Sequence, residues 1–136
     1  MFLVYQPEGA DEPKRWRYDP KKLMSVERED IERRTERNFA QFVTDVIQGN
    51  SLCRRALLFT FLRREHPTTR FEDVNFLWDE LELEYSRQEW ERMREAVLDT
   101  QHGDQLAASL TLIDRELQTA FDDVAEEGKA PPPTAD

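Results

Sequence analysis

This sequence of 136 residues has little of what most metal and cofactor sites are built from. It contains one cysteine and two histidines, too few for a zinc site of the usual spacing or for an internal disulfide. Its four glycines form no phosphate-binding loop. No apolar run approaches the ~18 residues of a membrane span, and no secretory signal is recognisable. We therefore expect a cytoplasmic protein with no metal, no cofactor and no membrane contact.

Candidate catalytic groups are equally scarce. Ser25, Ser51 and Ser86 stand where helix caps are expected, which explains them without a nucleophilic role. Cys53 falls within an apolar stretch, where a lone cysteine usually behaves as a small core residue. We therefore expect no catalytic residues and no enzyme.

The sequence is rich in charged residues, which make up 35% of the chain and give it a net charge of -10. Residues 1–70 carry +3, residues 71–103 carry -7 and residues 104–136 carry -6. An acidic chain repels phosphate backbones, so nucleic acid is not an expected partner. A local basic group either faces solvent, pairs with the acidic half of the chain, or forms a patch for an acidic partner. It consists of Arg54, Arg55, Arg63 and Arg64.

The apolar pattern predicts a mainly α fold, a small helical domain with a short N-terminal β-hairpin and a C-terminal amphipathic helix. Residues 2–5 and 15–18 read as the hairpin, and helices are expected over about 25–35, 38–48 and 51–65. The segment from about Val74 has helical spacing and is expected to turn extended near Leu83. The predicted core is Phe39, Phe42, Val43, Val46, Leu57, Leu58, Phe61, Leu62 and Trp78.

The residue pattern of the second half of the chain predicts two further helices and a tail. Ser86 and Glu89 form a capping box that starts one helix, and Asp104 is expected to cap the next. The predicted organisation is a helical domain with the hairpin over 1–103, a heptad-like amphipathic helix over 104–125 and a disordered tail over 126–136. The heptad helix could pack back, self-associate into a homo-oligomer, or grip another helix.

Aromatic and aliphatic side chains in this half either fill the core or form a groove for a partner helix. As partner-binding candidates we select residues from the segment before the capping box, from the helix after it and from the heptad seam. They are Leu81, Leu83, Tyr85, Trp90, Leu110, Ile113 and Leu117.

Three stretches in this order resemble the tail assembly chaperones of long-tailed double-stranded DNA phages and prophages. They are "VYQPEGADEPKRWRYDPKKLMSVEREDIERRT", "RRALLFTFLRREHPTTRFEDVNF" and "DELELEYSRQE", which cover about residues 4–90. The resemblance implies a protein that binds the tape-measure protein in the host cytoplasm. It would keep this client soluble until the major tail protein polymerises, and would be absent from the mature virion.

Such families often make a longer product by ribosomal frameshifting near the end of the gene. Glu127-Gly128-Lys129 could be encoded by a slippery run of codons, which makes a frameshifted form a hypothesis for this chain. Two other functions remain open. Residues 38–65 could form a helix-turn-helix DNA-binding regulator that presents the basic group, or the chain could be a structural virion subunit.

Overall fold

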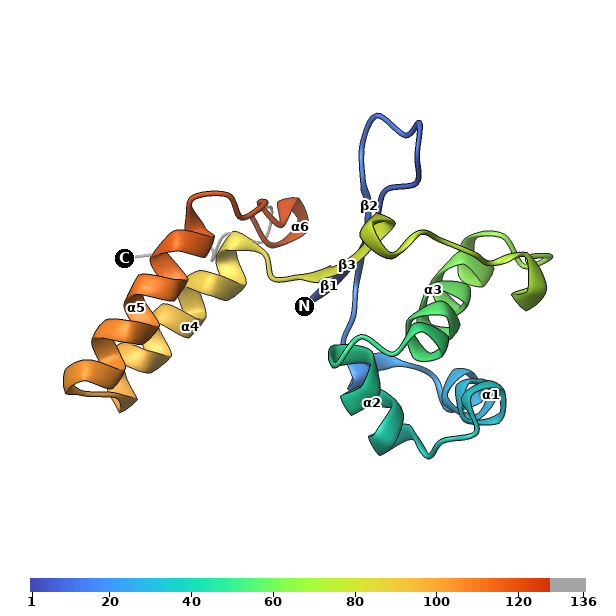
Figure 1. The fold of residues 1–136 in the computed structure, drawn as a ribbon, viewed down its shortest axis with the longest axis horizontal. Helices are drawn as coiled ribbons and strands as arrows, with labels where there is room; N and C mark the ends of the chain where they lie inside the picture. The colour runs from blue at the N-terminus through green and yellow to red at the C-terminus, as the bar shows by residue number, and fades with distance from the viewer. Residues whose placement is uncertain (128–136) are drawn as a thin grey trace, which may run out of the picture. The chain divides into compact units, whose positions relative to one another are not determined.

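The computed structural model describes residues 1–127 and confirms the mainly α class, with a small three-stranded antiparallel sheet (Figure 1). Contacts divide the chain into two compact units. The first comprises Phe2–Glu84, and the second comprises Met1 and the chain from Tyr85 onward. The sequence analysis had grouped residues 87–100 with the first helices, whereas the contacts place them with the C-terminal helix.

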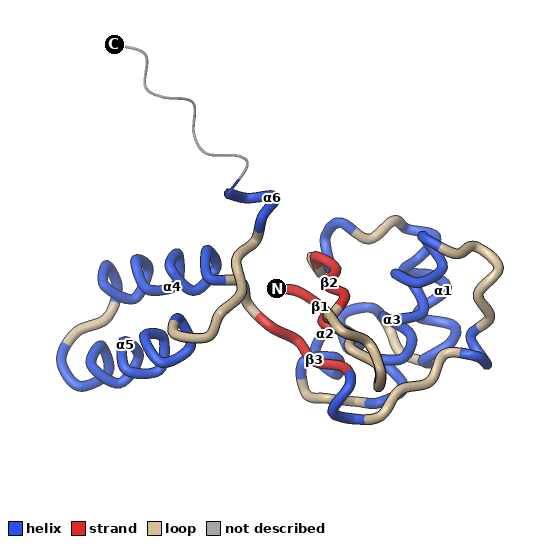
Figure 2. Tube along the Cα trace, turned by 90° about the horizontal axis from the view of Figure 1, so that it is seen from above, coloured by secondary structure: helices blue, strands red, loops and turns tan. Residues whose placement is uncertain are grey.

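The sheet of the first unit consists of β1 (Phe2–Tyr5), β2 (Lys14–Arg17) and β3 (Leu81–Glu84), with β1 in the centre (Figure 2). The hairpin expected from the sequence is present, with Leu3 opposite Trp16. On its other side β1 pairs with β3, so that Leu3 also faces Leu83. The third strand stabilises the hairpin, because an isolated two-stranded hairpin is only marginally stable in water.

The three α-helices of this unit pack on one another: α1 (Ser25–Thr35), α2 (Phe39–Ile47) and α3 (Ser51–Glu65), with a 3-10 turn η1 (Pro20–Lys22) before them. The Asn38 side chain caps α2 by accepting a hydrogen bond from the Gln41 amide at 2.9 Å. Asn50 rather than Ser51 caps α3, because its side chain accepts from the Cys53 amide at 3.0 Å. Similarly, α1 begins at Ser25, and the residue before it holds the N-cap position.

Helix α3 is the centre of the first unit. Cys53 and the six residues Ala56–Phe61 are all buried, and the Trp16 ring of β2 stacks on Phe61 with centroids 5.8 Å apart. Most of the predicted core is correct. Phe42, Val46, Leu57, Leu58 and Phe61 are buried, and Phe39, Val43 and Leu62 are half-buried.

The segment between α3 and β3 differs from the prediction. No helix begins at Val74; two 3-10 turns, η2 (Phe71–Asp73) and η3 (Trp78–Glu80), are joined by extended chain. The cause is Arg55 of α3, which donates hydrogen bonds to the carbonyls of Val74 and Phe71 at 2.7 and 2.8 Å. These side-chain bonds hold the segment along α3 in place of helical backbone bonds. Trp78, which was predicted to be core, lies in the second of these turns and is 61% exposed.

The second unit is built on two antiparallel helices, α4 (Arg87–Thr100) and α5 (Gly103–Leu117), followed by the short α6 (Val124–Glu127). The Ser86–Glu89 capping box is present as predicted. His102, not the predicted Asp104, occupies the N-cap position of α5. The helix ends at Leu117, seven residues before Val124, so the predicted helix over 104–125 was too long. Beyond the two residues that belong to α6, the tail predicted over 126–136 lies outside the described residues.

Helix α5 ends where it does because the chain turns back to the start of α4. The Phe121 carbonyl accepts a hydrogen bond from the Arg87 amide at 2.7 Å. The Asp123 amide donates to the Gln88 side chain at 2.9 Å. These two bonds fix residues 121–123 against the first turn of α4, which a continued α5 could not reach.

Candidate functional site

An open apolar groove runs between α4 and α5 in the second unit. Its volume is about 310 Å³. Its lining is almost entirely apolar and comes from both helices: Trp90, Met93, Ala96 and Val97 from α4, and Ser109, Leu112 and Ile113 from α5. Spacings of three and four residues place the α4 members on one face of that helix.

Polar contacts fix the two helices on either side of this groove. Arg94 of α4 donates to Asp114 of α5 at 2.9 Å. The Ser109 hydroxyl donates to the Gln101 side chain at 2.6 Å, near the connection between the helices. Gly103, at φ +60°, supplies the left-handed backbone conformation with which that connection enters α5. The groove is therefore held open by a defined hairpin rather than by a loose pair of helices.

An aromatic pair lies at the start of α4. The Tyr85 ring meets Trp90 edge to face, with centroids 5.2 Å apart and an angle of 74° between the planes. Such a pair fixes the orientation of the indole. Trp90 is thus a rigid apolar side chain of the groove wall.

The hairpin leaves most of its apolar surface uncovered. Ile113 is the one buried apolar residue within 85–125, whereas Leu112 is 52% and Leu98 is 45% exposed. A helix usually buries its apolar stripe against a further layer of structure. The arrangement is suited to receiving an apolar face from another helix.

The structure separates the seven partner-binding candidates into two groups. Trp90 and Ile113 line the groove, Tyr85 contacts Trp90, and Leu110 and Leu117 are half-buried on α5. Leu81 and Leu83 belong to β3 of the first unit. Leu81 is 1% exposed, so it is a core residue and cannot contact a partner in the folded protein.

The sequence analysis missed Leu112, a leucine of the groove wall that is 52% exposed. The heptad seam passes through Leu110, Ile113 and Leu117 and omits it. The available signal was the adjacent pair Leu112-Ile113, since two neighbouring apolar residues widen an apolar stripe beyond a single seam.

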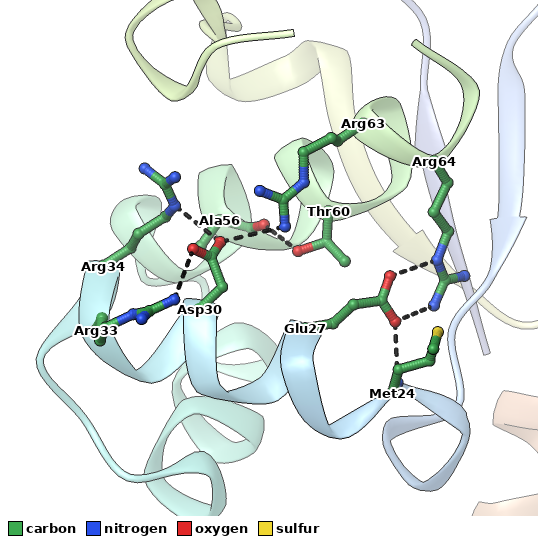
Figure 3. Close-up of polar contacts among 9 residues, drawn as sticks. All are labelled: Met24, Glu27, Asp30, Arg33, Arg34, Ala56, Thr60, Arg63 and Arg64. Atoms are coloured by element: carbon green, nitrogen blue, oxygen red, sulfur yellow. Dashed lines mark hydrogen bonds and ion pairs between the residues drawn. The ribbon is translucent and has the colours of Figure 1, made fainter. Parts of the chain in front are cut away.

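The predicted basic group does not form a free patch. Arg64 makes two hydrogen bonds to Glu27 of α1, at 2.7 and 2.6 Å, and Arg63 lies 3.5 Å from Asp30 (Figure 3). Asp30 also accepts from Arg34 at 2.8 Å, so these contacts join α1 to α3. The hydrogen bonds from Arg64 hold the pKa of Glu27 below its usual range.

The other two arginines of the group bind backbone carbonyls. Arg54 donates to the Val46 carbonyl at 3.0 Å, and its guanidinium lies 5.4 Å from the centre of the Trp78 ring. Arg55 holds the segment before β3, as described above. All four arginines therefore stabilise contacts within the first unit. Pairing with acidic side chains of the second half of the chain, one of the alternatives considered above, is not seen in these bonds.

No cluster of three or more histidine, cysteine, aspartate or glutamate side chains suited to a metal ion occurs in residues 1–127. The Cys53 side chain is fully buried, and burial raises the pKa of its thiol. In the same part of the chain no helix has both the length and the apolar character needed to cross a membrane. Comparisons with protein-family models, curated proteins and solved structures find no match to this chain.

Proposed function

We propose that this chain is a binding protein for an apolar helical segment of a larger client, which docks in the groove between α4 and α5. The observation that carries the proposal is the apolar lining of the groove on a hairpin with a single buried apolar residue. Helix-in-groove recognition requires an apolar channel of this kind between two fixed helices. The proposal includes no catalytic activity.

The resemblance to phage tail assembly chaperones suggests which protein this client is. We propose that it is the tape-measure protein and that binding in the host cytoplasm keeps it soluble until the major tail protein assembles. The high content of charged residues favours such a role, because a charged carrier keeps a complex with an apolar client in solution. A frameshifted longer form would carry its extension beyond Glu127, and its junction at Gly128 and Lys129 lies outside the described residues.

The two alternative functions have less support. A DNA-binding regulator would use α3 as its recognition helix, but Ala56–Phe61 of that helix are buried and its arginines bind groups of the first unit. A structural virion subunit would also use an apolar groove. Mass spectrometry of purified virions separates the two roles, since only a structural subunit remains in the particle.

The proposal is tested by co-expressing the chain with the tape-measure protein of the same phage or prophage and measuring the soluble fraction of that protein. We expect Leu112→Asp to abolish solubilisation, because it places a charge in the groove wall at a position that is already half exposed. Val26→Asp is the matched control, since Val26 is 61% exposed on α1.

Circular dichroism establishes that both variants remain folded. A soluble client in the presence of Leu112→Asp would contradict the groove as the contact site. An insoluble client in the presence of the unaltered chain would contradict the chaperone function itself.

A further inference from the structure

The apolar side chains of the groove would be covered by a further helix packed across α4 and α5. Besides the half-exposed Leu112 of the groove wall, Leu98 at the end of α4 is 45% exposed. Two helices alone cannot cover both of their apolar stripes, whereas three or four helices can. A partner helix and a second copy of this hairpin would each complete such a bundle, and charge distinguishes them.

Residues 85–127 are strongly acidic. They carry eleven acidic and four basic side chains, a net charge of -7. Arg94 is already neutralised by Asp114, and Arg87 pairs with Asp122. Within the described residues, several acidic side chains of this unit have no ion pair: Glu91, Glu95, Asp99, Asp104 and Glu116.

Two of these carboxylates lie beside the groove. Glu116 follows Leu112 by one helical turn and therefore lies along the same edge of α5. Asp99 follows Ala96 by three positions and lies in the last turn of α4, which contains no basic residue. An acidic side chain at the carboxyl end of a helix is unfavourable for the helix itself, since the dipole there is also negative. A cationic group of a partner would relieve this repulsion.

We propose that the groove selects an amphipathic helix whose apolar face is flanked by lysine and arginine, with Glu116 and Asp99 as the residues that determine this preference. This inference rests on the proposed function, because it specifies the client segment for the same groove. A second copy would bring another unit of charge -7 against the first, whereas basic flanks neutralise the carboxylates on both rims. The acidic surface would also steer a basic segment toward the groove before contact.

The test uses the full chain and two synthetic amphipathic peptides of equal length that share one leucine face. One peptide carries lysine on the flanks and the other carries glutamate, and a scrambled lysine peptide controls for binding without an apolar face. We expect the lysine peptide to bind at least about tenfold more tightly than the glutamate peptide in about 0.05 M salt, and this ratio to shrink in about 0.5 M salt. Isothermal titration calorimetry measures both affinities.

The variant Glu116→Gln should reduce the preference for lysine, whereas Glu29→Gln on the exposed surface of α1 should leave it unchanged. Equal affinity for the two peptides would overturn the charge preference while leaving the groove a binding site. Equal affinity for the lysine peptide and its scrambled form would overturn the inference as well. If neither peptide binds and sedimentation shows a dimer that Leu112→Asp dissociates, the occupant is a second copy and the inference fails.

Discussion

The indole of Trp78 lies directly against the backbone of Gly49. A Cβ atom at residue 49 would stand 2.9 Å from Cη2 of that ring, closer than side chains pack in folded proteins. Gly49 also has φ +89°, a conformation that side-chain-bearing residues rarely adopt. The glycine therefore fixes both the end of α2 and the position of an exposed tryptophan.

We expect Gly49→Ala to lower the free energy of unfolding by about 1–2 kcal/mol, because alanine must adopt the left-handed conformation and the indole must move. Gly9→Ala is the matched control, since Gly9 has φ +87° with no atom within 4 Å of the added Cβ. Chemical denaturation measures both variants. Tryptophan fluorescence should change in Gly49→Ala alone, and an unchanged spectrum would contradict the contact with Trp78.

Tyr18 gives a prediction for alkaline pH. Its side chain is 3% exposed, and burial raises the pKa of its phenol to about 12. The unfolded chain ionises near its usual pKa of about 10, so unfolding becomes easier as the pH rises from about 10 to about 12, by a total of roughly 2–3 kcal/mol. Phenylalanine has no ionisable group, so Tyr18→Phe should not show this loss, and the free energies of unfolding of the two proteins, measured across that range, should diverge in favour of the variant as the pH rises.

The same hydroxyl gives a prediction at neutral pH. The Tyr18 hydroxyl is a buried side-chain polar atom for which residues 1–127 offer no hydrogen-bond partner. Leaving a buried hydroxyl unpaired costs about 1–3 kcal/mol, so we expect Tyr18→Phe to be at least as stable as wild type. Thermal unfolding at pH 7 measures this difference. A clear loss of stability would show that the hydroxyl has a partner in solution.

The ion pair between Glu27 and Arg64 predicts the response to acid. Arg64 lowers the pKa of Glu27, so its contribution to stability is complete above the usual glutamate range and disappears as the pH falls through the folded pKa. Glu27→Gln should cost about 1 kcal/mol at pH 7, since the Arg64 side chain is 43% exposed and the pair is partly screened. Unfolding curves of the two proteins at acidic and neutral pH should approach one another as the pH falls.

Ser86 tests the start of α4. Its side chain is fully buried and accepts a hydrogen bond from the Glu89 amide at 3.2 Å. We expect Ser86→Ala to destabilise the helix by about 1 kcal/mol, through loss of the cap. Hydrogen exchange should accelerate in α4 while α3 remains protected. Uniform acceleration in both helices would instead mean that the two units unfold together.

Local signals predicted the helices well, because caps and apolar periodicity act within one or two turns. The Asn38 cap and the Ser86–Glu89 box begin α2 and α4 as expected. Strand β3 was harder to assign, because its four residues, in which leucine alternates with glutamate, follow a segment with helical spacing. Its pairing with β1, at residues 2–5, is a long-range contact that no local pattern contains.

The lining of the groove could be predicted in part, because helical periodicity is also a local signal. Trp90 and Ile113 lie in the groove because helical spacing places them on inward faces. Leu81 has equally apolar neighbours in sequence, but its burial depends on which strand it pairs with. Trp78 is exposed after a segment that Arg55 holds through its carbonyls, and such bonds from a charged residue leave no trace in the apolar pattern.

The position of β1 between β2 and β3 also determines the order in which the protein can fold. Residue Phe2 pairs with Glu84, and everything from α1 to α3 lies between them in the chain. During synthesis β2 can join β1 early, but the other side of β1 stays without a partner until Leu81–Glu84 emerge. The contacts among the three helices are more local, so we expect these helices to assemble first and the sheet to close late, which completes the first unit.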